Sequence, residues 1–373
     1  MRKLLKNPIV YAWLRKAMWI VNSIRTSVIL PKRQTLLKVR YIYDRQDWVI
    51  HSIGKIIEKY MQTKDIDFAL TTSPALLVNC VIHFGSVWTY TSRPTDLIHS
   101  SNRIVVTVFH GNYGITTAMD QGIETLRKRI KKVDAIIVST RIMESRLKEW
   151  GICDNKIFYI PLGVDTNVFR PAPESERKHW RTHLGIPAGA VCIGSFQKDG
   201  NGWKEGLEPK LIKGPDIFVN VVEKLSESID VVCLLTGPSR GYVKKELEKR
   251  GISFIHRYPQ EKKELCKFYN CLDLYLITSR EEGGPLAIME SLACKIPLVA
   301  TKVGMAPDII KEGKNGFLVE VNSVEEIVRK AKDILNNTEI RKRLYANSRR
   351  SILYVDWKKL IPHYHEIYSQ LNK

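Results

Sequence analysis

Short apolar runs alternate with longer amphipathic stretches along most of this chain. Apolar runs of this kind are typical of strands buried on both faces of a parallel sheet, and apolar positions three or four apart predict the helices that cover it. The first half therefore predicts an α/β domain, with helices such as 48–60 and 123–132 between its strands. Its predicted strands are residues 39–43, 68–71, 81–84, 104–109, 135–139 and 157–160.

A second α/β series follows a stretch rich in glycine and proline, residues 161–173, which predicts a linker. Two tandem α/β domains place a cleft beyond the carboxyl ends of their strands, the usual ligand site. We expect domain boundaries at 1–168 and 169–350, with 351–373 as a C-terminal helix. The predicted strands of the second series are residues 191–195, 231–236, 252–256, 272–277, 298–301 and 316–319.

The chain is strongly basic, with 59 Lys and Arg against 39 Asp and Glu in 373 residues, a net charge of +20. This charge favours polyanionic partners such as nucleic acid, anionic lipid or phosphorylated substrates. The densest basic run, 127–132, has no interleaved aromatic residues and resembles no nucleic-acid module. We therefore expect no nucleic-acid partner, and we prefer an anionic membrane surface or a lipid-phosphate acceptor.

The seven cysteines are scattered, and none forms a C-x-x-C pair. Their odd number and spacing argue against a disulfide framework or a zinc site, and for a reducing compartment. We expect most of them to be small buried apolar side chains.

Residues 1–33 carry eight basic and no acidic side chains. Arg25 interrupts the longest apolar candidate, 17–30, so no run there reaches the roughly 18 residues needed to span a bilayer. Leu5, Ile9 and Trp13 recur four apart, as on one helical face. Two interpretations stay open: an interfacial membrane helix, and a basic helix packed on its own domain.

The clearest chemical signal follows the predicted strand 272–277. Gly283 and Gly284 permit unusual dihedrals and close approach of the backbone, and Pro285 suits the first position of a helix that continues through the good helix formers of 286–294. The free N–H groups and positive dipole of such a helix start favour an anion such as a diphosphate. Glu290, just past the first turn, can accept hydrogen bonds from a ribose diol.

The region 272–320 resembles the donor-site signature of glycosyltransferase family 4. The similarity rests first on two glutamates separated by seven residues, Glu282 and Glu290. It also rests on the segments 296–304 and 315–319 and on the linker near 161–171. The resemblance as a whole extends over about residues 104–345. The resemblance implies a GT-B fold, two Rossmann-like domains with a donor cleft between them, and a retaining mechanism. It also implies that the segment 351–373 returns to the N-terminal domain.

The resemblance also implies roles for single residues. Glu282 would lie beside the donor sugar and Glu290 at the ribose, whereas Glu281 is expected on a solvated face. Lys213, followed by a glycine, would hold the diphosphate with a second cation, for which Lys198 is preferred over Lys204 and Lys210. The remaining donor contacts would come from His110 in the N-terminal domain and from Gly237, Arg257, Tyr258, Gly283, Gly284, Pro285 and Leu286.

Two features limit the resemblance. Residues 41–48 replace the Gly-Gly loop by which family members contact donor and acceptor, so the acceptor side is not implied. Asp65 and Asp67 spell a D-x-D metal motif, but they precede the predicted strand 68–71 and are interpreted as a surface turn. No metal and no cofactor is expected.

The sequence thus predicts a retaining glycosyltransferase that moves a sugar from a UDP- or GDP-sugar to a hydroxyl of a glycan, lipid-linked or small-molecule acceptor. We expect a role in the synthesis of cell-surface glycan, lipopolysaccharide or glycolipid. The expected location is cytoplasmic, at the inner face of the membrane. Two alternatives remain: a nucleotide-sugar epimerase of similar fold, which would act on its donor without an acceptor, and a basic nucleic-acid-binding protein.

Overall fold

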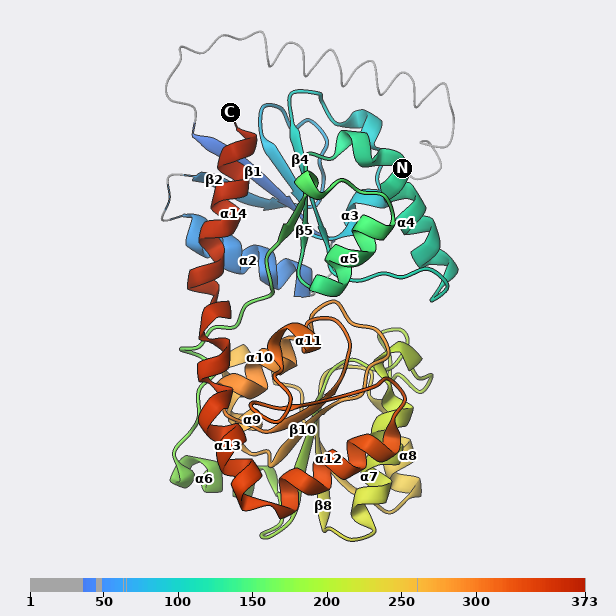
Figure 1. The fold of residues 1–373 in the computed structure, drawn as a ribbon, viewed down its shortest axis with the longest axis vertical. Helices are drawn as coiled ribbons and strands as arrows, with labels where there is room; N and C mark the ends of the chain where they lie inside the picture. The colour runs from blue at the N-terminus through green and yellow to red at the C-terminus, as the bar shows by residue number, and fades with distance from the viewer. Residues whose placement is uncertain (1–35, 45–48, 63, 65, 260, 373) are drawn as a thin grey trace. The chain divides into compact units, whose positions relative to one another are not determined.

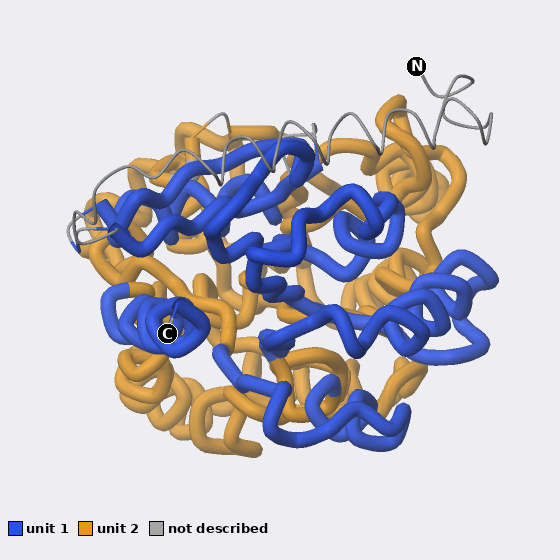
Figure 2. Tube along the Cα trace, turned by 90° about the horizontal axis from the view of Figure 1, so that it is seen from above, with its two compact units in different colours: residues 1–139, 143–160, 358–373 blue, residues 140–142, 161–357 orange. Residues whose placement is uncertain are grey.

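A computed structural model describes residues 36–44, 49–62, 64, 66–259 and 261–372. The predicted basic segment 1–33 lies outside these residues. The chain forms two compact units: residues 1–139, 143–160 and 358–373 make unit 1, and residues 140–142 and 161–357 make unit 2. Figure 2 distinguishes the two units by colour.

Unit 1 is built on a parallel sheet whose six described strands lie in the order β2-β1-β3-β4-β5-β6. The strands are β1 Leu37–Ile42, β2 Ile66–Thr71, β3 Val81–Phe84, β4 Arg103–Val108, β5 Ala135–Val138 and β6 Ile157–Tyr159. The described helices are α2 Val49–Met61, α3 Val87–Thr91, α4 Thr117–Arg129, α5 Arg141–Glu149 and α14 Trp357–Leu371. All residues of β3 and β5 are buried, as expected for central strands covered on both faces.

The last helix, α14, belongs almost entirely to unit 1 (Figure 1). Its Tyr368 is fully buried, and the Tyr368 hydroxyl lies 2.6 Å from His83 Nδ1 in β3. The other ring nitrogen of His83 lies 2.7 Å from the Thr107 hydroxyl of β4. Burial lowers the pKa of His83 to about 3, so the neutral ring ties α14 to two central strands.

Unit 2 contains a second parallel sheet, with its described strands in the order β12-β11-β10-β7-β8-β9. This is the Rossmann order, in which the direction of winding reverses between the first and fourth strands, here β7 and β10. The strands are β7 Val191–Phe196, β8 Val231–Thr236, β9 Ser253–His256, β10 Leu274–Ile277, β11 Leu298–Thr301 and β12 Phe317–Val319. The described helices are α6 Glu174–Leu184, α7 Pro215–Ser226, α8 Gly241–Lys249, α9 Lys262–Asn270, α10 Leu286–Ala293, α11 Ala306–Ile309, α12 Val324–Asn336 and α13 Thr338–Ser348.

The core of unit 2 joins α7, α8 and α12 to its strands. Phe218 and Val222 of α7, Leu247 of α8 and Ile334 of α12 are all fully buried in one cluster with Leu274 of β10. These helices have apolar positions three to four apart, so each presents one continuous face to the sheet. The rigid sheet that results fixes the loops at its carboxyl edge.

The predicted α/β class with two sheets is confirmed, and each predicted strand overlaps an observed one. One predicted helix is displaced: α4 begins at Thr117, where the Thr116 side chain caps it, and residues 130–132 form a separate 3-10 turn. The interpretation of Asp67 as a turn residue was wrong, because Asp67 lies inside β2, paired with Arg40 at 2.7 Å. No helix in the described part of the chain has the length and apolar character needed to cross a bilayer.

Candidate functional site at the switch point of unit 2

The loop after β10 is held in place by backbone and side-chain hydrogen bonds to its neighbours. Thr278 Oγ1 donates to the carbonyl oxygen of Gly214 at 2.8 Å, and Thr301 Oγ1 donates to that of Ser279 at 2.6 Å. The Arg280 guanidinium forms a two-bond pair with Asp216 in the first turn of α7. Residues 278–282 are therefore fixed against the segment 211–216 at the switch point of the sheet, where α/β proteins bind ligands.

Helix α10 starts at Leu286, one residue later than predicted. Pro285 has φ −65° and ψ 104°, so it precedes the helix as its cap residue; the prediction that it occupies the first helical position was wrong. Its φ suits either position, and only its extended ψ excludes it from the helix. Pro285 makes no side-chain cap hydrogen bond to α10, and the Ile288 amide donates to the Pro285 carbonyl oxygen at 3.0 Å. Binding of an anion by the amides before Ile288 stays a prediction.

Of the two glycines before Pro285, Gly284 is required by close packing. Neither Gly283 nor Gly284 has a positive φ. A Cβ on Gly284 would lie 2.8 Å from Leu162 Cδ1 and 2.9 Å from Met305 Sδ, so no larger residue fits there without movement. The left-handed conformation occurs instead at Gly304 (φ +52°), which packs against the carbonyl oxygens of Glu282 and Gly283.

Glu282 and Lys213 form an ion pair at this loop. Lys213 Nζ lies 2.6 and 2.7 Å from the two carboxylate oxygens, and Ser279 Oγ donates to one of them at 2.8 Å. The Glu282 side chain is 9% exposed and that of Lys213 is 23% exposed. Two short charge-assisted contacts to one ammonium are directional, so the two predicted residues are positioned as one unit.

The neighbouring Glu281 is buried, although it was expected on a solvated face. Its side chain is only 8% exposed, so the expectation of a solvated position was wrong. The Glu281 amide approaches the carbonyl oxygen of Ile212, which draws the loop onto the segment before α7 and carries this residue inward.

Glu290 lies in α10 and is also buried, at 8% exposure. Its Oε2 accepts a 2.9 Å hydrogen bond from the hydroxyl of Tyr269 in α9. Burial, followed by the charge of Glu290, raises the pKa of Tyr269 well above its usual value, so Tyr269 remains a donor. The phenol ring stacks edge-on against Phe196 with ring centroids 4.8 Å apart, which fixes the orientation of the carboxylate.

Three lysines are candidates for the predicted second cation: Lys198, Lys204 and Lys210. Lys198 follows β7, and its ammonium lies 3.9 Å above the ring of Trp203. Burial, and then the charges of Lys213 and Lys198, lower the pKa of Lys210, so these three ammonium groups share one electrostatic environment. Lys204 is exposed. Lys198 and Lys210 thus stay the candidates for a second cation with Lys213, whereas Lys204 lies exposed on the loop.

The loop 199–209 is anchored by a buried ion pair that the sequence analysis missed. Asp199 and Arg240 are both fully buried, and their charged atoms lie 3.0 Å apart. The Arg240 guanidinium also donates to the carbonyl oxygens of Ser195, Gln197 and Thr236. Burial raises the pKa of Asp199, and Arg240 opposes that rise. Nothing local in the sequence marks two charges 41 positions apart as partners.

The remaining predicted donor residues lie at the ends of β8 and β9. Gly237 has φ +98°, and a Cβ there would lie 2.5 Å from the carbonyl oxygen of Gln197. His256 Nε2 lies 2.8 Å from the carbonyl oxygen of Gly237, which links the two strand ends. Arg257 is exposed, and Tyr258 is 60% exposed, so its ring is available for stacking against a planar base.

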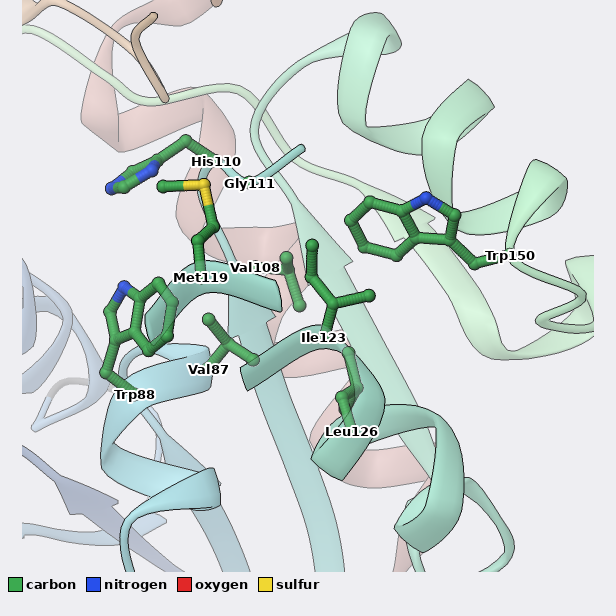
Figure 3. Close-up of a pocket in the computed structure, with 9 residues that line it drawn as sticks. All are labelled: Val87, Trp88, Val108, His110, Gly111, Met119, Ile123, Leu126 and Trp150. Carbon is green, nitrogen blue, oxygen red and sulfur yellow. The ribbon is translucent and has the colours of Figure 1, made fainter. Parts of the chain in front are cut away.

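His110 lies in unit 1, two residues after the end of β4. It borders a small apolar pocket, and Figure 3 shows it there with Trp88 of α3 and Trp150, which follows α5. The lining residues are Val87, Trp88, Val108, His110, Gly111, Met119, Ile123, Leu126 and Trp150. His110 thus lies just beyond a strand's carboxyl end, as predicted, among mainly apolar lining residues.

Among the residues that the structure describes, no group of three or more His, Cys, Asp or Glu side chains is placed to hold a metal ion. Asp67 of the D-x-D motif is occupied by Arg40, whose hydrogen bond lowers the pKa of that carboxyl.

Gly214, which follows Lys213, yields a test of how this site is built. It has φ +63°, and a Cβ would lie 1.9 Å from the carbonyl oxygen of Thr278. We expect Gly214→Ala to lower the free energy of unfolding by about 2–5 kcal/mol, because left-handed strain and overlap add. Gly185→Ala is the matched control: φ is +77° and nothing lies within 4 Å, so only about 1 kcal/mol of strain is expected. Urea titrations measure both, and equal losses would contradict the close approach.

The chain is similar in sequence to known glycosyl transferases. The family model "Glycosyl transferases group 1" matches residues 207–351, within unit 2. The D-inositol 3-phosphate glycosyltransferase of Xylanimonas cellulosilytica is 28% identical over 254 residues, 64% of this chain and 58% of its own length. The sulfoquinovosyl transferase of Arabidopsis thaliana is 28% identical over 201 residues, 52% of this chain and 36% of its own length. The chain spans about half the length of the curated relatives it matches.

Solved structures share the fold across both units. A glycosyltransferase from Rickettsia africae superposes with a TM-score of 0.68 at 16% identity, covering 91% of this chain and 99% of its own. The Anabaena protein HepE in complex with UDP gives a TM-score of 0.71 at 15% identity, covering 90% and 100%. At these identities the likeness establishes the architecture, the two-domain α/β fold predicted as GT-B.

Proposed function

We propose that this chain, whose residues 207–351 match the group 1 glycosyl transferases, is a retaining glycosyltransferase that uses a UDP- or GDP-sugar. The observation that carries the proposal is the convergence at one switch point of the start of α10, the Lys213–Glu282 pair and the buried carboxylate of Glu290. Two relatives of this chain are named glycosyltransferases for inositol phosphate and sulfoquinovose, and HepE was solved with UDP.

Each part of this site suits one part of a nucleotide-sugar. The N–H groups at the start of α10 and the lysines 198, 210 and 213 suit the diphosphate, and Glu290 suits the ribose hydroxyls. Glu282, held by Ser279, suits a hydroxyl of the sugar. Tyr258 offers an exposed ring to the base. All of these residues lie in segments that follow the carboxyl ends of strands β7, β9 and β10.

In the proposed reaction an acceptor hydroxyl attacks the anomeric carbon on the face from which the diphosphate leaves. A phosphate oxygen of the donor takes the acceptor proton, so no enzymic nucleophile is needed. The protein's task is to stabilise the negative charge that develops on the leaving diphosphate. Lys213 can supply that stabilisation because its ammonium is already positioned by Glu282. The acceptor class and the peripheral membrane location stay predictions.

A panel of nucleotide-sugars tests the proposal by thermal unfolding. A ligand at about 100 times its Kd stabilises the folded state by about 2.7 kcal/mol, so the correct donor should raise the Tm by roughly 5 °C. We expect one UDP- or GDP-sugar to give this shift and the free sugar to give none. The bound donor is then incubated with candidate acceptors, and the anomeric configuration of the product is read by NMR.

Two results would contradict the proposal. One is the absence of a shift with every nucleotide-sugar and nucleoside diphosphate. The other is conversion of the donor to an epimer without any acceptor, which would favour the epimerase alternative.

A further inference from the structure

Two thiols lie together beside the proposed ribose carboxylate. Cys266 belongs to α9 and Cys294 is the residue after α10, and their sulfur atoms are 3.8 Å apart. Both are free thiols; Cys266 is partly exposed, whereas Cys294 is buried. The sulfur atoms of a disulfide are about 2.05 Å apart, so these two sulfur atoms must come closer by less than 2 Å for the bond to form.

The surroundings of Cys266 favour its thiolate. Asn270 Nδ2 lies 3.4 Å from the sulfur, within reach as a donor, and either thiol of the Cys266–Cys294 pair can donate to the other. When protonated, Cys266 Sγ also donates to the carbonyl oxygen of Arg170 at 3.5 Å. The hydrogen bond from Cys294 is the main cause that lowers the pKa of Cys266 to about 7. By contrast, burial raises the pKa of Cys80 and Cys271 to about 11. The nucleophilic sulfur in this part of the chain is therefore also the accessible member of a pair.

We propose that Cys266 and Cys294 are a peroxide-sensitive dithiol whose oxidation weakens nucleotide binding, an inference that rests on the proposed function. The Cys266 thiolate attacks one oxygen of a hydroperoxide, forming a sulfenic acid and releasing the other oxygen as water or alcohol. The Cys294 thiol then attacks the sulfenic sulfur, the S–S bond forms and water leaves. Two thiols are oxidised by two electrons, one peroxide is reduced, and a dithiol restores the reduced pair.

The bond would act directly on Glu290. Cys294 lies one helical turn after Glu290, and its amide donates to the Glu290 carbonyl oxygen at 3.1 Å. Tyr269, which holds the Glu290 carboxylate, lies three residues after Cys266 on α9. Drawing the two sulfur atoms together therefore moves both partners of the Tyr269–Glu290 hydrogen bond. Displacements approaching 1 Å at a binding group reduce its contribution severely, so we expect at least about tenfold weaker binding.

Peptide mapping and nucleotide titration of the full chain test this inference. The protein is treated with hydrogen peroxide, and linked peptides are identified by mass spectrometry. UDP and GDP are then titrated into the reduced protein, the oxidised protein and the oxidised protein after dithiothreitol. We expect a Cys266–Cys294 linkage, a Kd at least about tenfold higher for the nucleotide that binds, and full recovery after reduction.

Two variants separate the pair from general oxidation. Cys266→Ser should bind nucleotide normally and lose the response to peroxide. Cys153→Ser, which removes an exposed cysteine, should respond like the parent protein. The inference is overturned if no Cys266–Cys294 linkage forms, or if it forms and the Kd is unchanged. Failure of the reduced protein to bind either nucleotide would instead overturn the proposed function, while peptide mapping still decides whether the linkage exists.

Discussion

Replacing Glu290 by alanine is expected to weaken UDP or GDP binding by about 100-fold or more. Two hydrogen bonds from ribose hydroxyls to a buried carboxylate contribute about 1.5–3 kcal/mol each, and 1.4 kcal/mol corresponds to a factor of ten. The substitution also leaves the buried Tyr269 hydroxyl without its acceptor, so stability should fall by about 1–3 kcal/mol. Isothermal titration measures the binding, and thermal unfolding verifies that the variant is folded.

Tyr269→Phe is the matched control for this experiment. It removes the same Tyr269–Glu290 hydrogen bond but keeps the carboxylate and the aromatic packing against Phe196. We expect a similar loss of stability with only a few-fold change in Kd, since a neutral hydrogen bond contributes about 1 kcal/mol. If both variants lost nucleotide equally, Glu290 would act through the packing of α9 and α10. Unchanged binding by Glu290→Ala would refute the assigned role.

For Lys213→Ala we expect a loss of about 100- to 1000-fold in kcat, with a smaller change in KM. An interaction that strengthens as charge develops on the leaving group acts on the transition state more than on the bound donor. Lys204→Ala is the control, because it removes an equal charge from the exposed part of the neighbouring loop. Initial rates with the donor found in the thermal panel measure kcat and KM for both variants.

A structural cause for the Lys213→Ala defect must be separated from a catalytic one. Without Lys213 the Glu282 carboxylate keeps Ser279 as a donor but loses its counter-charge. The double variant Glu282→Gln/Lys213→Ala removes that unpaired charge. If Lys213 acts on the diphosphate, the double variant stays as slow as Lys213→Ala. If the double variant instead recovered the kcat of Glu282→Gln, the single variant Lys213→Ala would only have disturbed the loop. If Lys213→Ala lowered kcat no more than Lys204→Ala does, the proposed role of Lys213 would be refuted.

The sheets could be predicted because their strands are short apolar runs bounded by polar residues. Burial on both faces removes the alternation seen in half-exposed strands, so the runs stand out even without an alignment. The ends were less accurate: β10 starts at Leu274, two residues after the predicted start. The start of α4 was missed because residues 117–122 include few large apolar side chains, and its signal was the capping Thr116.

The candidate site was predicted in part, as far as its residues follow one another along the chain. The strand, the two glycines and the helix after them are local, and they indicate an anion site by themselves. The pairings within the site are not local: Lys213 meets Glu282 across 69 positions, and Tyr269 meets Glu290 across 21. The burial of Glu281 likewise depends on the distant backbone of Ile212. Such contacts depend on how the strands and helices are arranged in the fold, and no spacing of residues along the sequence reveals them.

The order in which the chain is synthesised has a consequence for unit 1. The hydrogen bond between His83 and Tyr368 spans 285 positions, and the buried face that α14 covers lies on strands from the first third of the chain. Unit 2 draws nearly all of its residues from one continuous stretch, 161–357. During translation every strand of unit 2 is available before the helix that completes unit 1 exists. Of the two units, the one whose strands are synthesised first is therefore the one whose core is completed last.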